Sequence, residues 1–159
     1  MQSPRLIKVL QFIAIVLTAL ALAPELAHIA SLPNKIDLVE SNYFIAQMIY
    51  NGWALFGVVI IGAIVANIAL AIALFFKGGK ANRGMPLLLT AVTVGFLIAG
   101  LAVFFAFTYP ANVATDNWTA APADWQSWRW QWETSHAVNA ALTFLGFCTL
   151  TASALVTSA

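Results

Sequence analysis

The chain has 159 residues, of which 62% are hydrophobic and only 8% are charged. Soluble domains carry about 25% charged residues, so this composition excludes an ordinary water-soluble fold and favours an integral membrane protein. Seven basic and six acidic side chains give a formal net charge of +1. No basic cluster is long enough to neutralise a row of phosphates, which excludes a nucleic-acid partner.

Four apolar runs follow one another along the chain and predict four transmembrane helices. They cover about residues 6–32, 53–76, 86–109 and 134–156. About 20 apolar helical residues cross a bilayer core of about 30 Å, and four such spans use nearly all of residues 1–159. The sequence therefore predicts one all-α domain, a four-helix bundle that spans the cell (inner) membrane several times.

Prolines and a change of periodicity refine these helices. Pro24 is expected to kink the first helix and Pro110 to end the third after Tyr109, because proline disrupts a helix interior. Residues 34–50 predict an amphipathic helix, since their apolar side chains recur at helical spacing. The fourth helix is expected to begin early, near Pro122, and to extend beyond the membrane on the outer side.

The basic residues predict the orientation of the bundle. Five of the seven precede the first run or lie between the second and third: Arg5, Lys8, Lys77, Lys80 and Arg83. Only Lys35 and Arg129 fall in the other connections. Because lysine and arginine in short loops mark the cytoplasmic side, we expect both termini in the cytoplasm and the two long connections outside.

A stripe of polar and aromatic side chains begins the fourth helix. Its members recur at steps of three and four, which places them on one helical face: Trp125, Arg129, Trp132, His136 and Asn139. The stripe lies among tryptophans for which an aromatic belt at the membrane boundary is one explanation. Trp128 and Trp130 point away from the stripe and fit that explanation, whereas Trp125 and Trp132 are candidates for stacking on a planar apolar ligand.

Two Glu-x-x-His units stand at the outer ends of the first and fourth helices. Glu25 precedes His28 by three residues, and Glu133 precedes His136 by three; ionisable groups in membrane spans are costly and suggest function. Such units supply half of the ligands of four-helix dimetal proteins, but the second and third runs offer no matching glutamate. Three arrangements stay open: a dimetal centre, a single ion on both histidines and one carboxylate, or ordinary pairing of Glu133 with Arg129 and of Glu25 with His28.

Several segments resemble the anthrone oxygenase-like family of small four-helix membrane proteins. They span nearly the whole chain: Ala27-His28, Leu32-Pro33-Asn34-Lys35, Gln47 through Trp53, Pro110-Ala111-Asn112, Asn117-Trp118, and Trp125 through Arg129, Trp132, Glu133 and His136. The chain departs from that family in two places, because related sequences often carry a glutamate at Ser31 and Glu25 is not typical of them. This departure weakens the paired Glu-x-x-His units more than it weakens a role for His28 or His136.

The resemblance implies that an anthrone, or another apolar and quinone-like aromatic molecule, is oxidised by molecular oxygen without an organic cofactor. In such a reaction a base removes a methylene proton and a cation stabilises the enolate. His136 is then expected as the base and Arg129 as the cation, with Glu133 and His28 in the same catalytic group. The expected substrate-binding residues are Trp125, Trp132, Tyr43 and Asn112.

A non-catalytic alternative is an accessory subunit of a larger membrane complex, or a homo-oligomer. Ala91 with Gly95, and Ala102 with Ala106, are four residues apart and allow close contact between helices. A transporter is less favoured, because the spans hold no charged residue at mid-membrane. The lipid bilayer is the partner that the composition itself requires, and a bound metal stays an open possibility.

Overall fold

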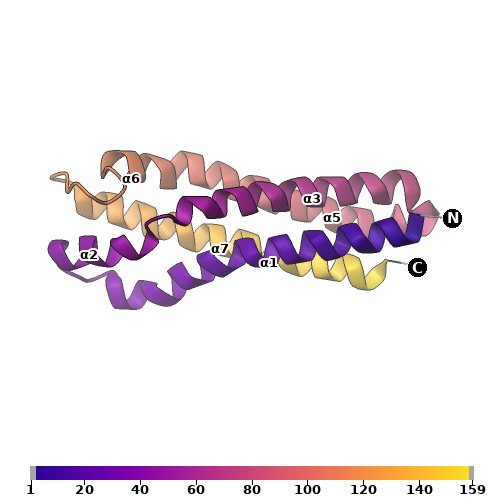
Figure 1. Ribbon diagram of the computed structural model, residues 1–159, viewed down its shortest axis with the longest axis horizontal. Coiled ribbons are helices and arrows are strands. Elements are labelled where there is room, and N and C mark those ends of the chain that lie inside the picture. Colours follow the sequence, from indigo (N-terminus) through magenta and orange to yellow (C-terminus); the bar gives the residue numbers. More distant parts are fainter. Residues whose placement is uncertain (1–2, 158–159) are drawn as a thin grey trace.

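The computed structural model describes residues 3–157, and these residues form an elongated helical bundle (Figure 1). The elements, in chain order, are α1 (Ser3–Lys35), α2 (Glu40–Gln47), the 3₁₀ turns η1 (Met48–Tyr50) and η2 (Trp53–Leu55), α3 (Phe56–Lys77), α4 (Gly79–Asn82), α5 (Met85–Val103), the π-helical turn η3 (Phe104–Thr108), α6 (Tyr109–Ala114) and α7 (Trp125–Val156). The described part of the chain contains no strand, which confirms the all-α fold class.

Four helical stretches of the described residues are long and apolar enough to cross a membrane: Arg5–Lys35, Trp53–Lys77, Gly79–Ala114 and Trp125–Val156. Their outward side chains are often large and apolar, as at Phe12, which is 69% exposed, and Val58, which is 73% exposed. Such an apolar surface suits contact with lipid hydrocarbon. A helix also satisfies its own backbone hydrogen bonds in that environment. The features are those of a multi-pass membrane protein.

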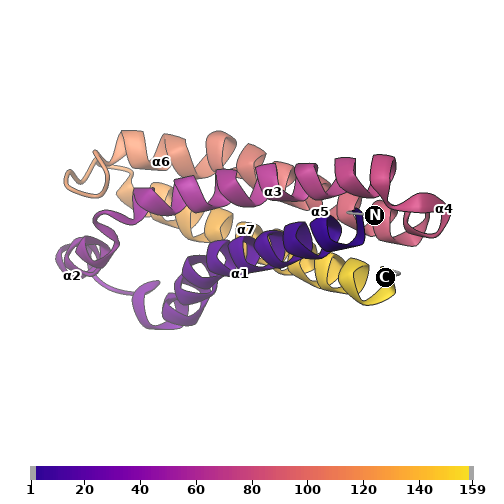
Figure 2. The ribbon, with the colours of Figure 1, turned by 45° about the vertical axis from the view of Figure 1, so that its right-hand side comes forward.

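The long helices run side by side, and both ends of the chain lie at the same end of the bundle (Figure 1, Figure 2). α1 packs against α3 and α7, while α5 packs mainly against α7. The short α4 lies at the end with the termini, here named the terminal end. α2 and the loop of residues 115–124 lie at the opposite end, here named the cap end.

Hydrogen bonds between side chains fix the helices against one another in the apolar part. Asn67 Nδ2 on α3 donates to Thr18 Oγ1 on α1 at 3.1 Å, and Thr90 and Ser153 share a hydroxyl hydrogen bond of 2.8 Å between α5 and α7. Polar side chains hold membrane helices together in this way, because lipid offers no competing partner. These bonds join α3 to α1 and α5 to α7.

α1 extends further than its apolar run predicted. The helix continues through Pro24 and Pro33 to Lys35, whereas the apolar run predicted an end at about residue 32. Its last turn therefore carries a lysine. A basic residue in the last turn of a helix interacts favourably with the helix dipole. The extension brings Lys35 onto the same helical backbone as Glu25 and His28.

The predicted end of the third helix at Tyr109 is wrong. The chain stays helical through Pro110 as far as Ala114, and the turn that precedes α6, Phe104–Thr108, is π-helical. A proline ring clashes with the carbonyl four residues earlier in a regular α-helix, and the wider π turn relieves that clash. The longer helix carries Asn112 to the cap end.

The predicted helix over residues 34–50 is shorter in the structure. α1 takes its first two residues, a turn follows, and α2 covers only Glu40–Gln47 before η1. α2 has two distinct faces, because Tyr43 and Gln47 are buried whereas Ile45 is 64% exposed. α7 begins at Trp125, close to the start expected near Pro122.

Candidate functional site

Ionisable and aromatic side chains gather at the cap end between α1, α7 and the segment that joins α1 to α3. The cap-end cluster consists of Glu25, His28, Lys35, Tyr43, Tyr50, Trp132, Glu133 and His136. On α1, His28 follows Glu25 by three residues and Lys35 follows His28 by seven, so these three share one helical face. On α7, Trp132 and His136 are four residues apart and also share a face, with Glu133 beside them. Two helical faces that are distant in sequence therefore meet here.

The two histidines lie against each other. The rings of His28 and His136 have centroids 4.0 Å apart and planes inclined by 16°, which is a stacked arrangement. His28 is 5% exposed, and its Nδ1 has no hydrogen-bond partner among the described residues. The structure thus brings together the histidines that the sequence placed on different helices.

Glu25 reaches from α1 to α7. Its Oε2 lies 3.4 Å from Nδ1 of His136, so the expected pairing of Glu25 with His28 on its own helix is wrong. The stacking of His28 on His136 turns the His28 ring toward α7 and leaves Glu25 facing the second imidazole. A carboxylate at one ring nitrogen orients an imidazole and leaves the other nitrogen to exchange protons.

The second nitrogen of His136 is accessible from outside the cluster. The His136 side chain is 14% exposed, and its Nε2 has no hydrogen-bond partner among the described residues. Nε2 is also not fully buried. His136 therefore combines an acidic partner at Nδ1 with an unpaired, partly exposed Nε2.

Lys35 and Glu133 form a buried ion pair. Lys35 Nζ lies 3.0 Å from Glu133 Oε1, and the two side chains are 5% and 2% exposed. The ammonium group also donates to the Tyr50 hydroxyl at 2.9 Å and lies 5.0 Å from the centroid of the Trp132 ring. Tyr43 OH donates to the same Glu133 oxygen at 2.8 Å, so both charges have additional partners, as buried ions require.

Arg129 contacts the turn before α2 rather than Glu133. Its Nη1 donates to the carbonyl oxygen of Leu38 at 2.8 Å, and its Cζ lies 4.7 Å from the centre of the Trp125 ring. The expected pair with Glu133 is therefore wrong, because Lys35 occupies that carboxylate. Arg129 lies seven residues, or about 10 Å along the helix, from His136, and it ties α7 to the turn before α2.

Tyr43 supports the cluster from α2. The residue is completely buried, at 0% exposure, and burial, followed by the neighbouring Glu133 carboxylate, raises the pKa of the Tyr43 hydroxyl above its ordinary value. Tyr43 therefore stays neutral and donates its proton to Glu133. Its expected role as a substrate contact has no free surface in this conformation.

The tryptophans divide between two neighbourhoods. Trp125 packs on Tyr43 and on Arg129, whereas Trp132 lies with its ring centroid 4.2 Å from His136 and 4.9 Å from His28. Of these two, only Trp132 lies next to the histidines; Trp53 also lies close to them, with its ring centroid 5.5 Å from that of His28. Trp130 is 56% exposed, in keeping with its expected position away from the stripe.

Asn112, one of the expected substrate-binding residues, fixes the orientation of Trp132. Its Oδ1 accepts a hydrogen bond from the indole Nε1 at 2.8 Å. The longer third helix makes this contact possible, since Asn112 belongs to α6. Asn112 is thus a positioning residue for the indole that contacts His136 edge-on.

A short left-handed turn inserts Trp118 into the same aromatic layer. Asp116, Asn117 and Trp118 have positive φ angles of 47°, 53° and 67°, a conformation that bulky side chains rarely adopt. The turn is held by Asn117 N, which donates to the Asn112 carbonyl at 2.7 Å, and by Trp118 N, which donates to Thr115 Oγ1 at 3.1 Å. Trp118 is consequently buried, with its ring centroid 5.6 Å from that of Trp132.

The four expected metal ligands have different partners. Glu25 faces His136, and Glu133 is engaged by Lys35 and Tyr43. Across residues 3–157, no group of three or more histidine, cysteine, aspartate or glutamate side chains is placed to hold a metal ion. The donor set expected from the two Glu-x-x-His units does not gather around one point.

Sequence reasoning missed Lys35, Tyr50 and Ser31 as members or neighbours of the site. Ser31 Oγ donates to the His28 carbonyl at 2.9 Å and lies 3.1 Å from the Tyr50 hydroxyl. A signal for Lys35 was available, because it follows His28 by seven residues and so shares its helical face. Tyr50 gave no such signal, since it belongs to a 3₁₀ turn outside the long helices.

Comparisons of the chain with known proteins give no information on its function. No protein-family model, no curated protein and no solved structure matches the chain. The function is therefore argued from the chemistry of the cap-end cluster.

Proposed function

We propose that the protein is a membrane-embedded oxidoreductase, a monooxygenase that acts on an apolar aromatic or quinone-like molecule. The observation that carries the proposal is the Glu25–His136 pair, with Nδ1 of His136 facing a carboxylate and Nε2 unpaired and partly exposed. An imidazole in this arrangement suits general base catalysis near neutral pH. The adjacent Trp132 ring is an apolar neighbour of His136; because it is only 4% exposed, a planar substrate stacks on it only after the cap end rearranges.

The chemistry begins at a methylene group that is acidified by flanking aromatic rings. Nε2 of His136 takes the methylene proton, and the Glu25 carboxylate stabilises the imidazolium that forms. The carbanion, as its enolate, transfers electrons to molecular oxygen, and loss of water from the resulting hydroperoxide leaves a carbonyl. The overall change, R₂CH₂ + O₂ → R₂C=O + H₂O, balances with oxygen as the only oxidant.

The resemblance to the anthrone oxygenase-like family supports the same chemistry but assigns the cation to Arg129. In the cluster, Lys35 is the better candidate, because its Nζ lies near the Trp132 ring that contacts His136. Arg129 lies about 10 Å along α7 from His136 and contacts Leu38 and Trp125. In this proposal Lys35, which shares its charge with Glu133, is the cation nearer to the developing enolate.

Purified protein in detergent, incubated with an anthrone under air, tests the proposal through the absorbance of the quinone product. His136→Ala is expected to lower the rate by about 100-fold or more, since general base catalysis contributes about 10²–10⁴-fold. Thr134→Ala is the matched control, because Thr134 is an exposed neighbour on α7. Equal rates for His136→Ala and the unaltered protein would remove the proposed base.

A non-catalytic subunit that packs against another membrane protein, or against a second copy, is the second candidate. The outer face of the third span favours it, because only 17% of its most apolar window is buried, against 33–39% in the other three spans. Ala91 and Gly95 are exposed on this span, and a Cβ at Gly95 would meet no atom within 4 Å. Close contact between helices uses such small residues.

Gly95→Leu separates this second candidate from the enzyme. If the second candidate is right, the larger side chain is expected to break an assembly that co-purifies in mild detergent. If the protein is an enzyme that acts as a single chain, Gly95→Leu is expected to form the quinone at the rate of the unaltered protein. An unaltered protein that is always recovered as a single chain would contradict the second candidate.

A further inference from the structure

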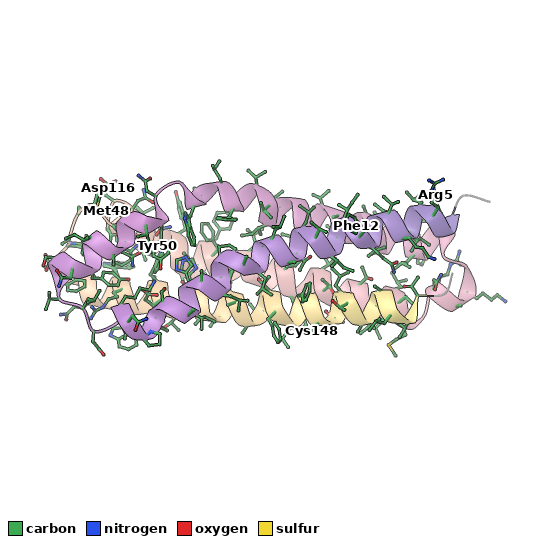
Figure 3. The ribbon with its side chains drawn as sticks, turned by 60° about the horizontal axis from the view of Figure 1, so that its bottom comes forward. Arg5, Phe12, Met48, Tyr50, Asp116 and Cys148 are labelled. Atoms are coloured by element: carbon green, nitrogen blue, oxygen red, sulfur yellow. The ribbon has the colours of Figure 1, made fainter. Side chains whose placement is uncertain are left out.

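A hollow on the outer face of α1 lies at the terminal end, remote from the cap-end cluster. It is lined by Arg5, Lys8, Val9 and Phe12 and has a volume of about 420 Å³. These residues follow the spacing of a single helical face. Arg5 and Phe12 lie along the same part of α1, at the opposite end of the bundle from Tyr50 (Figure 3).

The two cations of the hollow have no counter-charge among residues 3–157. Neither Arg5 nor Lys8 has a hydrogen bond or ion pair with residues 3–157, and the ion pairs found in that range belong to the cap-end cluster. All six acidic side chains belong to the second half of α1, to the first turns of α7, or to the segments at the cap end: Glu25, Asp37, Glu40, Asp116, Asp124 and Glu133. Within residues 3–157 no negative group is paired with Arg5 or Lys8, so both cations are available to an anionic group that is not part of these residues.

The hollow changes from charged to apolar along the helix. Arg5 lies nearest the end of the bundle, and Phe12 lies seven residues, or about 10 Å, further toward its middle. Val9 is 48% exposed and Phe12 is 69% exposed. A cationic end followed by an exposed apolar surface is complementary to a molecule with an anionic headgroup and a hydrocarbon chain.

We propose that this hollow binds one anionic phospholipid. The phosphate group is held by Arg5 and Lys8, whose guanidinium and ammonium groups form charge-assisted hydrogen bonds to phosphate oxygens. One acyl chain lies against Val9 and Phe12. A zwitterionic phospholipid binds less well, because its own ammonium group competes for the phosphate.

The site is tested by mass spectrometry of the full chain under native conditions in mild detergent. Phosphatidylglycerol and phosphatidylcholine with identical acyl chains are the two probes, and the protein is expected to retain the first preferentially. Arg5→Gln/Lys8→Gln is expected to weaken retention of phosphatidylglycerol about 25-fold, since each basic residue near an anionic lipid contributes about fivefold. Lys77→Gln/Lys80→Gln removes the same charge outside the hollow and is expected to retain the lipid as the unaltered protein does.

Two further arms make the outcome decisive. Phe12→Ala leaves both cations in place and is expected to weaken retention several-fold by removing acyl-chain contact; an unchanged affinity would contradict the proposal even if the double variant is not recovered. Inorganic phosphate is expected not to displace phosphatidylglycerol, and displacement at equal concentration would reassign the hollow to a free anion. An equal loss in both double variants would show a general effect of charge and overturn the site.

Discussion

Lys35 and Glu133 meet in a part of the protein from which water is almost completely excluded. Removing two charges from water costs several kcal/mol for each ion, and the cost is offset only where the pair has good geometry and further hydrogen bonds. Tyr50 and Tyr43 supply those hydrogen bonds, one to each partner. The pair therefore joins α1 to α7 and holds α2 over both.

Replacing Lys35 alone tests this view of the pair. Lys35→Met is expected to destabilise the protein by about 3–5 kcal/mol, because it leaves the Glu133 carboxylate buried without a counter-charge. Unfolding in mixed micelles of increasing denaturing detergent, followed by circular dichroism, measures the loss. Lys80→Met is the control, since Lys80 is exposed and such substitutions change stability by about 0.5 kcal/mol or less.

The double variant Lys35→Met/Glu133→Leu separates charge from packing. Apolar side chains of similar volume often replace a buried ion pair without loss, so most of the stability is expected to return. A double variant that is as unstable as Lys35→Met would contradict this view, because the loss of stability would then not come from the unpaired Glu133 charge.

Short turns, at the scale of elements, decide where several residues of the site lie. The π turn before α6 lets the third helix pass Pro110, and Asn112 then meets Trp132. The left-handed turn at residues 116–118 directs Trp118 back into the aromatic layer. Each turn is unfavourable by itself, because the π turn departs from regular helical hydrogen bonding and the left-handed turn strains the backbone. Tertiary contacts at the cap end offset this free-energy cost.

The turn between α3 and α4 depends on the absence of a side chain at Gly78. A Cβ there would lie 2.6 Å from the Leu74 carbonyl oxygen and 2.7 Å from the Asn82 Cβ. Gly78→Ala is therefore expected to destabilise the protein by about 1–3 kcal/mol, the usual range for overpacking, as measured by thermal unfolding. Gly95→Ala is the matched control, because a Cβ there meets no atom within 4 Å and alanine favours a helix by about 1 kcal/mol.

Both termini and α4 share one end of the whole molecule. The concentration of lysine and arginine at that end favours a cytoplasmic location, and the cap-end cluster then faces the outer side. This orientation is a proposal that the bundle geometry permits, because an even number of spans returns the chain to its starting side.

Cysteine labelling in intact cells tests the orientation. In a Cys148→Ala background, Asp116→Cys is expected to react with a membrane-impermeant maleimide in intact cells, because residue 116 lies in the exposed cap-end loop (Figure 3). Lys80→Cys, which is also exposed, is expected to react only after the membrane is permeabilised. The reverse pattern would place the cap end in the cytoplasm.

The sequence alone predicted the four helices, because the length and hydrophobicity of an apolar run are local properties that determine whether it can span a bilayer. It also predicted the stripe of α7, since residues three and four apart share a helical face whatever surrounds them. Pro110 misled the prediction of the third helix, because the clash of a proline ring assumes regular α-helical geometry, which the π turn does not have.

Only the tertiary structure decided which faces meet. Glu25 pairs with His136 and Glu133 with Lys35, whereas the sequence had left pairing with His28 and Arg129 as one of three open arrangements. Spacing along one helix states which side chains share a face, but the rotation and register of α1 against α7 follow from packing along their whole length. The partners of a charge that crosses between helices therefore depend on contacts distributed over the entire bundle.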